Sequence, residues 1–424
     1  MATVIKGYWP GAGPLTGLSR RDRQGCDYTA YVPDRLMERQ FTISAREAAD
    51  VADAELAIAR LDQSASALAD TEALARLLLR AESVSSSKIE GLEVGARRLL
   101  RADIARVRNE DPHDVTAAEV LGNVDAMHYA LEAVDRSSEI TRDLLLDVHR
   151  RLMQPTSLHH LGGVVRTTQN WIGGSSHNPC SAAFVPPPPQ YVDELLADLC
   201  AFCNSDSTPA VMQAAIAHAQ FETIHPFADG NGRVGRALVH MIFRRRGLTT
   251  VITPPVSLVL ATMADDYVAG LTATRYVGNA TSAPALEGLN RWIATFSSAC
   301  TRSVNDAVAY EQRIATLQAQ WRERIGHVRS DSAVFRLMRA LPGSPVVTAA
   351  SVVKLIRCSL PAAISALERL AKANILSALS DRKRRQVFEA REVIATFTAL
   401  ERQLASPAGN TTIAKRRAPG SAGA

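Results

Sequence analysis

The sequence predicts a mainly α-helical protein with one central β-hairpin and a small separate domain near its C-terminus. Apolar residues recur three and four positions apart over most of the chain, and aromatic residues make up only 5% of it. With 424 residues, 46% of them hydrophobic, the chain is long enough to bury more than one hydrophobic core.

Composition and hydrophobic period divide the chain into five parts. These are an N-terminal arm with a helical region (1–135), a helical core (136–300), a helical linker (301–330), a small domain (331–400) and a tail (401–424). The tail is rich in Pro, Gly and Ser, and we expect it to be disordered. Within the core, the stretch "VRTTQNWIGG" breaks the helical period, and its paired glycines indicate a hairpin, here called the flap (164–175). Four consecutive prolines then end this region in an extended conformation.

Composition also limits the class of protein. The chain has a modest net charge of +5, no visible secretory signal and no long uncharged apolar run, so we expect a cytoplasmic protein that does not enter a membrane. Its six cysteines are scattered and do not predict a disulfide framework. Cys200 and Cys203 are expected in a helix core rather than at a metal, and His218 is expected to be structural.

Twelve residues, "HPFADGNGRVGR" at 225–236, concentrate the polar chemistry of the chain. Three of their glycines satisfy G-x-G-x-x-G, but the preceding run has helical spacing and no acid follows at the distance that a dinucleotide site needs. A loop that opens a helix near Gly232 exposes backbone N–H groups instead, and these form a ready site for anions. The stretch therefore favours a phosphate site over a nicotinamide or flavin site.

The polar side chains of this stretch suit a nucleotide and a metal ion. Arg233 and Arg236 lie three residues apart and can face one anion, although both oppose the helix dipole when no anion is bound. Asp229 can hold Mg²⁺ together with phosphate oxygens. His225 titrates near neutral pH and can accept a hydroxyl proton. Together these groups indicate phosphoryl-type transfer, while the sequence contains neither the P-loop nor the kinase signature.

The same stretch fits H-P-F-x-D-G-N-G-R-x-x-R and resembles the motif of the Fic family, with a likeness that extends over roughly residues 30 to 300. The resemblance implies a mainly helical fold and transfer of AMP from ATP to a hydroxyl side chain of a target protein (AMPylation), with Mg²⁺ as cofactor. It makes His225 the catalytic base and Asp229 the metal ligand. The residues that it assigns to the nucleotide are Gly230, Asn231, Gly232, Arg233 and Arg236.

Two other regions extend this resemblance. Ile172, Gly173 and Gly174 of the flap would cover the nucleotide, and the flap would receive the target protein. Tyr267 falls where the family often packs adenine. However, Val268 replaces the usual second tyrosine and Arg275 stands where some members have asparagine, so the choice of base stays open.

A second motif lies earlier in the chain. In "SVSSSKIEGLEV", Ser86 and Glu90 fit the family's inhibitory pattern [ST]-x-x-x-E-[GN], which places an inhibitory helix at 83–91. Its glutamate can pair with Arg236 and occupy the place of the γ-phosphate. ATP would still bind, but with its α-phosphate badly oriented for attack.

The C-terminal domain resembles a winged helix, because residues 346–390 follow the order helix, turn, helix, strand, basic loop, strand. Thr348 and Ser359 are expected to cap the two helices, with Pro361 in a first turn. The second helix is expected to turn Ile364, Leu367 and Leu370 inward, and the basic loop contains Arg382, Lys383, Arg384 and Arg385. Such a module binds DNA or a protein, or dimerises, and the sequence leaves this choice open.

Three functions therefore remain. The chain is an autoinhibited protein adenylyltransferase, a nucleotide-sensing DNA-binding regulator, or a hydrolase of the same fold that removes AMP with help from Glu90. The presence of His225 favours an enzyme, since a sensor has no need of a base.

Overall fold

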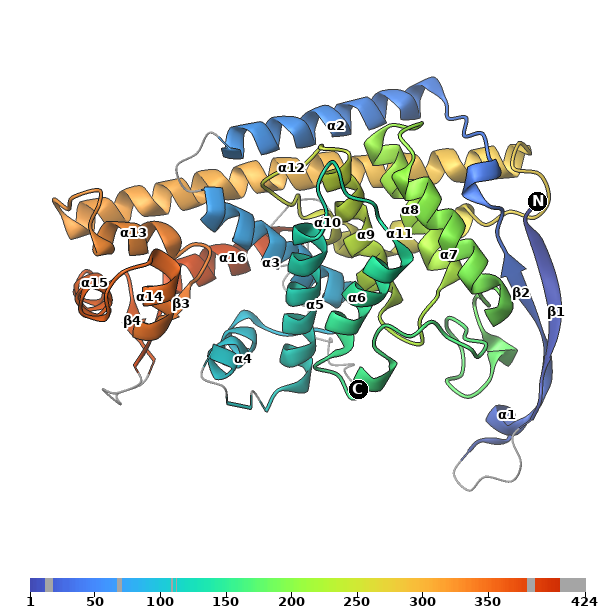
Figure 1. Cartoon of the computed structure of the whole chain (residues 1–424), viewed down its shortest axis with the longest axis horizontal. Coiled ribbons are helices and arrows are strands. Elements are labelled where there is room, and N and C mark those ends of the chain that lie inside the picture. Colours follow the sequence, from blue (N-terminus) through green and yellow to red (C-terminus); the bar gives the residue numbers. More distant parts are fainter. Residues whose placement is uncertain (12–17, 67–70, 108–109, 112, 380–385, 405–424) are drawn as a thin grey trace, which may run out of the picture.

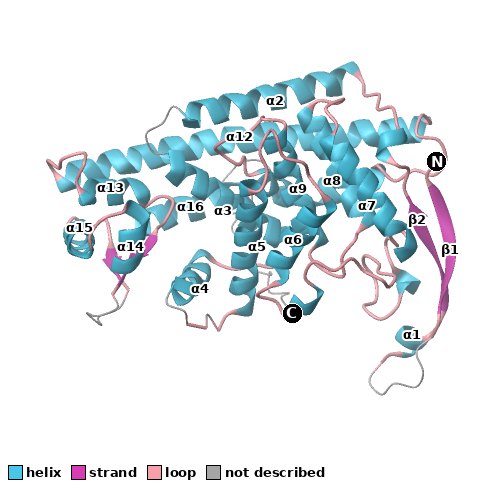
Figure 2. Ribbon diagram, in the orientation of Figure 1, coloured by secondary structure: helices cyan, strands magenta, loops and turns pink. Residues whose placement is uncertain are grey.

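The computed structural model describes residues 1–11, 18–66, 71–107, 110–111, 113–379 and 386–404, and it confirms the mainly α-helical class (Figure 1). Helix α12 (Ala283–Ile325) has 43 residues and spans roughly 65 Å at the usual rise per residue. Helix α2 (Ala45–Ser66) runs beside it, and the other helices pack beneath this pair. Figure 2 shows that the strands lie at the two ends of the molecule, with helices between them.

The predicted extended arm is a β-hairpin. Strands β1 (Thr3–Trp9) and β2 (Cys26–Val32) pair antiparallel, with Thr3 opposite Val32 and Trp9 opposite Cys26. The short helix α1 (Arg20–Arg23) precedes β2, and η1 (Leu36–Glu38) follows it. We call the flap together with the residues that follow it up to Pro188 the flap region. The hairpin contacts this region, because the Tyr31 N–H donates to the Val185 carbonyl.

The N-terminal helical region continues from α2 through α3 (Thr71–Ile89), α4 (Ala96–Val107) and α5 (Val115–Glu132). Asp114 caps α5 by accepting from the Ala117 N–H, and it also forms two hydrogen bonds with Arg98 of α4. Helix α3 contains the expected inhibitory segment as far as Ile89, and Glu90 lies in the turn that directly follows. The helix packs on α5, α9 and α10. It therefore lies inside the helical assembly rather than on its surface.

The core helices are α6 (Arg142–Met153), α7 (Pro189–Asn204), α8 (Ala210–Ile224) and α9 (Asn231–Arg245). Every residue of α8 is buried, which explains why its sequence is rich in alanine and has no polar face. Cys200 and Cys203 are buried in α7, as expected for core residues. Helices α8 and α9 are neighbours in space, joined by the twelve-residue motif.

Two helices follow α9, namely α10 (Val256–Thr262) and α11 (Ala264–Ala273), and the pair is bent by 99° at Met263. Met263 has φ −117° and ψ 37°, outside the helical region, and Asp265 and Asp266 place two carboxylates in the first turn of α11. Carboxylates at that position favour a helix N-terminus, which is the physical signal for the break.

The predicted flap hairpin is wrong in detail. The described chain after the short turn η2 (His159–Leu161) forms one isolated bridge rather than two regular strands. The bridge joins Ile172 to Phe184, on either side of the second short turn η3 (Pro179–Ser181). Gly173 and Gly174 adopt φ of 75° and 77°, a conformation that suits glycine and turns the chain before a ladder can extend.

The C-terminal unit has its own hydrophobic core. Its elements are α13 (Ala333–Ala340), β3 (Val346–Thr348), α14 (Ala349–Ile356), α15 (Leu360–Lys372), β4 (Ser377–Ala378), β5 (Val387–Glu389) and α16 (Arg391–Leu404). The strands pair antiparallel in the order β3-β5-β4, and Thr348 and Ser359 cap α14 and α15 as expected. The likeness to a winged helix stays a prediction, and its basic loop lies outside the described residues.

One expectation for this unit is wrong. Leu367 and Leu370 are buried, but Ile364 is 42% exposed. Leu360, one turn earlier in the same helix, is 52% exposed. Ala363 and Ala366 occupy the buried stripe instead, because that stripe is centred on the row 363, 366, 367 and 370. Helix α15 therefore exposes two large apolar side chains in its N-terminal half.

No single helix in the described ranges is long and apolar enough to cross a membrane. Two bent helix pairs, α10 with α11 and α14 with α15, pass the same length and composition test together.

Candidate active site

The motif links two helices through two left-handed residues. His225 ends α8 with φ 50° and ψ 61°, and Gly230 precedes α9 with φ 79° and ψ 6°. A left-handed conformation is unfavourable for a non-glycine residue, so the surrounding contacts must hold His225 in place. A Cβ on Gly230 would lie 3.0 Å from Leu152, which leaves little room for a larger residue. The sharp turn exposes the N-terminus of α9 beside His225.

Several side chains fix this loop from within and from outside. Asn231 accepts from the Phe227 N–H at 2.8 Å and donates to the Phe227 carbonyl at 2.9 Å. His149 stacks on Phe227 at 3.7 Å, and its Nε2 lies 3.0 Å from the Asp229 carbonyl. Arg166 Nε and Asn170 Nδ2 both donate to the His225 carbonyl, at 2.8 and 3.2 Å. The motif predicted a role for Asn231, whereas sequence reasoning missed the other three.

The imidazole of His225 is held neutral. Burial, followed by the positive charge of Arg166, lowers the pKa of His225 to about 4. Its Nδ1 lies 3.9 Å from Oε2 of Glu222, a buried carboxyl whose pKa is raised by burial to about 7. A neutral imidazole can accept a proton at physiological pH, which the chemistry proposed from the sequence requires.

Arg233 and Asp229 lie on the same side of the α9 N-terminus. The Arg233 side chain is almost wholly buried, yet its Nε and Nη1 have no hydrogen-bond partner within the described part of the chain. Its Nη2 contacts Asp229 Oδ2 at 3.3 Å. Buried guanidinium donors without partners are costly unless an anion joins them, so this arginine suits a phosphate group.

The residues also fit a magnesium ion that is shared with a substrate. The Asp229 side chain is about half exposed, at 49%, and stands beside the unpaired donors of Arg233. Across the described residues, no group of three or more His, Cys, Asp or Glu side chains could hold a metal by itself. A single carboxylate is the donor set expected for Mg²⁺ that takes its other ligands from phosphate and water.

Arg236 is occupied by helix α3. Its Nη2 donates to Glu90 Oε1 at 2.7 Å and to the Ser86 carbonyl at 2.7 Å, while its Nε donates to Ser86 Oγ at 2.8 Å. Burial alone would raise the pKa of Glu90, but the charges of Arg236 and Arg233 more than offset burial and hold that pKa below its ordinary value. Glu90 is therefore an ionised carboxylate paired with the motif.

The Glu90 carboxylate also lies against the start of α9. A Cβ built on Gly232 would collide with Glu90 Oε1, so the glutamate occupies the space directly over the backbone of this residue. This is the anion position that a helix N-terminus offers. The carboxylate therefore stands where an incoming phosphate would find both the helix dipole and Arg236.

Helix α3 is anchored by buried polar groups that sequence reasoning missed. Glu82, fully buried, accepts from the N–H and hydroxyl of Ser257 and lies 2.8 Å from Nε2 of His240. Asn123 of α5 donates to the Ser83 carbonyl and to the Ser87 hydroxyl, at 2.7 and 3.1 Å. The sequence did contain a signal for these contacts, namely polar residues among the apolar residues of α3. Buried polar groups need hydrogen-bond partners, so such residues indicate contacts with neighbouring helices.

The remaining predicted residues lie around this centre. Tyr267 is buried, with its hydroxyl 2.8 Å from His218 Nε2. His218 is also buried and bonds to this neighbouring side chain, as expected for a structural histidine. Arg275 stacks over Phe184 of the flap region, 3.5 Å from the ring centroid. Gly173 and Gly174 are exposed, and Ile172 is half-buried. The flap touches the motif through Arg166 and Asn170 rather than through these three residues.

Comparison with known proteins agrees with the helical fold. Residues 139–243 match the Fic/DOC family, and residues 48–132 match the Fic/DOC family N-terminal region. The fold resembles a Fic family protein from Desulfovibrio desulfuricans, with a TM-score of 0.50 and 22% identity over 82% of this chain and 97% of that one. The chain therefore contains a Fic/DOC region within residues 48–243.

Curated relatives match parts of the chain. It is 39% identical over 132 residues to protein adenylyltransferase fic-1 of Caenorhabditis briggsae, which covers 30% of this chain and 23% of the relative. It is 32% identical over 234 residues to protein adenylyltransferase Fic of Culex quinquefasciatus, which covers 52% of this chain and 43% of the relative. The chain thus matches less than half the length of either relative.

Proposed function

We propose that this chain is an autoinhibited protein adenylyltransferase that transfers AMP from ATP to a hydroxyl side chain of a target protein. The observation that carries the proposal is the motif loop, where a neutral His225 ends α8 and Arg233, in the first turn of α9, holds two buried donors without partners among the described residues. The names of the curated relatives support the same reaction.

The chemistry assigns a step to each group. The backbone N–H groups at the start of α9, together with Arg233 and Arg236, bind the phosphates of ATP. The target hydroxyl oxygen attacks the α-phosphorus, its proton passes to His225, and the bond to the leaving pyrophosphate breaks. Asp229 would hold Mg²⁺, which neutralises phosphate charge when it is bound. His149 and Asn231 keep the loop in the geometry that this transfer needs.

Autoinhibition follows from the contacts of Glu90. Its carboxylate uses the Nη2 donor of Arg236 and fills the space over Gly232, so a phosphate cannot take the same position at the same time. The terminal phosphate of ATP must then bind elsewhere, and the α-phosphate loses its alignment with the attacking oxygen.

Two other functions predict different results. A hydrolase would release AMP from a modified target and would need Glu90, which lies near enough to His225 to raise its pKa. A nucleotide-sensing DNA-binding regulator would bind ATP and DNA without transfer. The target protein would dock on the flap, while DNA, a protein partner or a second copy of the chain remains a candidate for the C-terminal unit.

The direct test is incubation of the Glu90→Gly protein with Mg²⁺ and α-labelled ATP, with and without cell lysate, followed by mass spectrometry of labelled peptides. We expect AMP on hydroxyl side chains of the chain itself or of lysate proteins. Loss of label from a pre-modified peptide, faster with wild type than with Glu90→Gly, would favour the hydrolase. Binding of ATP with no label in any sample would contradict transfer.

A further inference from the structure

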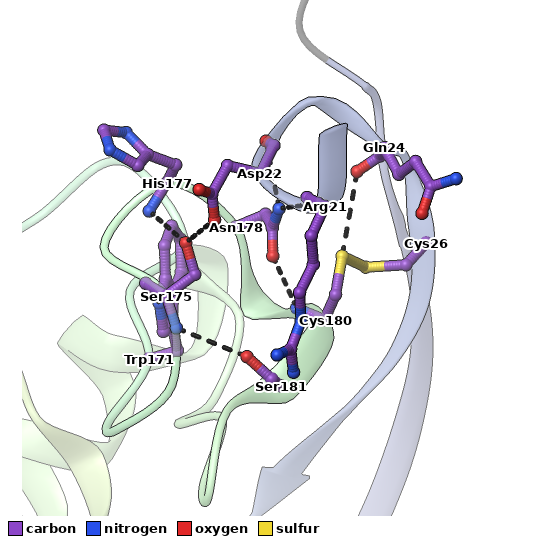
Figure 3. Close-up of a disulfide and its surroundings, with 10 residues drawn as sticks. All are labelled: Arg21, Asp22, Gln24, Cys26, Trp171, Ser175, His177, Asn178, Cys180 and Ser181. Atoms are coloured by element: carbon purple, nitrogen blue, oxygen red, sulfur yellow. Dashed lines mark hydrogen bonds between the residues drawn. A yellow bond between two sulfur atoms is a disulfide. The ribbon is translucent and has the colours of Figure 1, made fainter. Parts of the chain in front are cut away.

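The N-terminal hairpin and the flap region are joined by a disulfide that the sequence did not predict. Cys26 of β2 is bonded to Cys180 of η3, with 154 positions between them in the sequence (Figure 3). The expectation that the cysteines stay unpaired is wrong for these two, because the fold lays the hairpin across the flap region. No spacing rule could reveal this pairing.

Polar contacts surround the bond and form a seam between the two segments. Ser175 donates from its hydroxyl to Asp22 Oδ1 at 2.6 Å. Asn178 donates from Nδ2 to the carbonyls of Arg21 and Asp22, at 3.1 and 3.0 Å. Figure 3 shows these side chains grouped on one side of the disulfide, between α1 and the flap loop. We call this contact the hairpin–flap seam.

The far end of the same segment touches the reaction site. Arg166 and Asn170 donate to the His225 carbonyl, and Asn170 also donates to the Phe227 carbonyl at 3.1 Å. Trp171, next to Asn170, packs edge-on against Trp9 of β1 with ring centroids 5.1 Å apart. Residues 166–180 therefore run from the motif loop to the disulfide, and the state of the bond acts on the segment that holds His225.

These two cysteines are also accessible for reaction in a way that the three buried cysteines are not. Cys180 is exposed and Cys26 is half-buried, whereas Cys200, Cys203 and Cys300 are buried. Burial raises the pKa of the Cys200 thiol to about 11 and raises those of Cys203 and Cys300 as well. Helix α1, close to Cys26 in the chain, contains Arg20, Arg21 and Arg23, and positive charge favours the reactive thiolate.

We propose that Cys26 and Cys180 form a thiol–disulfide exchange site whose oxidation fixes the flap over the reaction site. In the forward reaction, one cysteine thiolate attacks a small-molecule disulfide of the glutathione type and expels a thiolate, leaving a mixed disulfide. The second cysteine thiolate attacks that mixed disulfide and expels the second small thiolate. The two cysteines thus lose two electrons and two protons, and the external disulfide is reduced to two thiols.

The consequence for activity rests on the proposed adenylyl transfer. In the oxidised protein the flap is held at both ends, by the motif contacts and by the bond, so less conformational freedom remains to be lost when a target docks. In the reduced protein the outer end loses its covalent link, and the noncovalent contacts hold it, namely the hydrogen bonds of the hairpin–flap seam and the packing of Trp9 on Trp171. The oxidised form is therefore the more active one.

The exchange site is tested first without any assay of activity. Purified chain is equilibrated in buffers of graded reduced and oxidised glutathione, then alkylated before and after reduction, and the peptides with Cys26 and Cys180 are quantified by mass spectrometry. We expect one two-electron transition shared by both cysteines, within the range that glutathione buffers span. Cys358, the half-buried free thiol, serves as the control and should not follow that transition. A pair that stays fully oxidised or fully reduced throughout would overturn the proposal.

The second test measures the flap itself. Amide hydrogen exchange of residues 171–184 should be about tenfold faster in the reduced protein, and equally fast in Cys26→Ser and Cys180→Ser under oxidising conditions. The Cys358→Ser protein should behave as wild type. Equal exchange in the oxidised and reduced forms would overturn a role in holding the flap.

Transfer is measured last, in the Glu90→Gly background, as AMP incorporated from labelled ATP by the oxidised and reduced proteins. We expect about threefold or more activity for the oxidised form, and no redox effect in Cys180→Ser. Equal activity in both states, with a flap that does respond, would overturn the regulatory half of the inference. Absence of transfer in both states would instead contradict the proposed function and leave the exchange site standing on the first two tests.

Discussion

Glu90 Oε1 lies 2.7 Å from Nη2 of Arg236, although 146 positions separate the two residues in the sequence. Arg236 is almost wholly buried, and the charge of Glu90 raises its already high pKa against the opposing effect of burial. The pair therefore holds two full charges at the N-terminus of α9. Arg236 is therefore already paired with a carboxylate before any nucleotide arrives, and the first predictions address this contact.

Replacement of Glu90 by glycine should activate the chain. The change frees the Nη2 of Arg236 and clears the space over Gly232, so the phosphates can bind in the aligned position. A buried charge-assisted pair is worth on the order of 1.5–3 kcal/mol, which corresponds to a gain of tenfold or more in AMP incorporation. Glu93→Gly is the matched control, because Glu93 is exposed three residues further on, and it should leave the rate unchanged. Equal rates for wild type and Glu90→Gly would remove the case for autoinhibition.

Ser86 and Arg236 should behave differently from Glu90. Ser86→Ala removes one hydrogen bond to Arg236 Nε but leaves the Ser86 carbonyl contact and Glu90 in place, so activation should be weak. Arg236→Ala releases Glu90 but also removes a phosphate ligand, so it should not activate at all. AMP incorporation by these variants, compared with Glu90→Gly, separates the inhibitory role of the pair from its binding role. Strong activation by Arg236→Ala would contradict the proposed phosphate contact.

His225→Ala should abolish transfer and preserve nucleotide binding. The base acts only in the chemical step, and general-base catalysis is typically worth roughly 10²–10⁴-fold. The change is introduced beside Glu90→Gly, and ATP binding is followed by calorimetry while transfer is followed with labelled ATP. His160→Ala, an exposed histidine outside the motif, is the control. Retention of most of the transfer activity would exclude His225 as the base.

The pH dependence of transfer should show a depressed histidine. Because burial lowers the pKa of His225 to about 4, its basic form predominates at all higher pH values, and kcat/KM should fall only as the pH drops through about 4. An unperturbed histidine would give this limb near 6.5. Glu222, with a pKa raised to about 7, can add a second limb, and Glu222→Gln identifies it. A limb near 6.5 that persists in Glu222→Gln would contradict the neutral buried imidazole.

The C-terminal unit gives a prediction about its partner. If residues 346–390 bind DNA through the basic loop, replacement of Arg382, Lys383, Arg384 and Arg385 by alanine should weaken binding and flatten its salt dependence. Fluorescence anisotropy with duplex DNA at several salt concentrations measures both effects. Helix α15 exposes Leu360 and Ile364, which are apolar and suit a protein surface better than a phosphate backbone. The absence of DNA binding by the intact chain at low salt would therefore favour a protein partner.

Much of the fold could be predicted because it depends on local patterns. The period of apolar residues predicted the mainly helical class, and the side chains of Thr348 and Ser359 marked two helix starts. The predictions that were wrong needed information from other parts of the chain. Ile364 could not be assigned to the exposed face without knowing which stripe of α15 meets α13 and α14.

The sequence by itself determined the chemistry of the motif, because glycines, cations, an acid and a histidine within twelve positions must fall around one helix N-terminus. It also identified Glu90 through a short local pattern. Only the tertiary structure decided which groups set the properties of these residues: Arg166 and burial for the pKa of His225, Glu82 and Asn123 for the place of α3, and Cys26 with Cys180 for the flap. The physical reason is that burial, charge and disulfide pairing depend on neighbours distant in the chain, and local patterns do not record those neighbours.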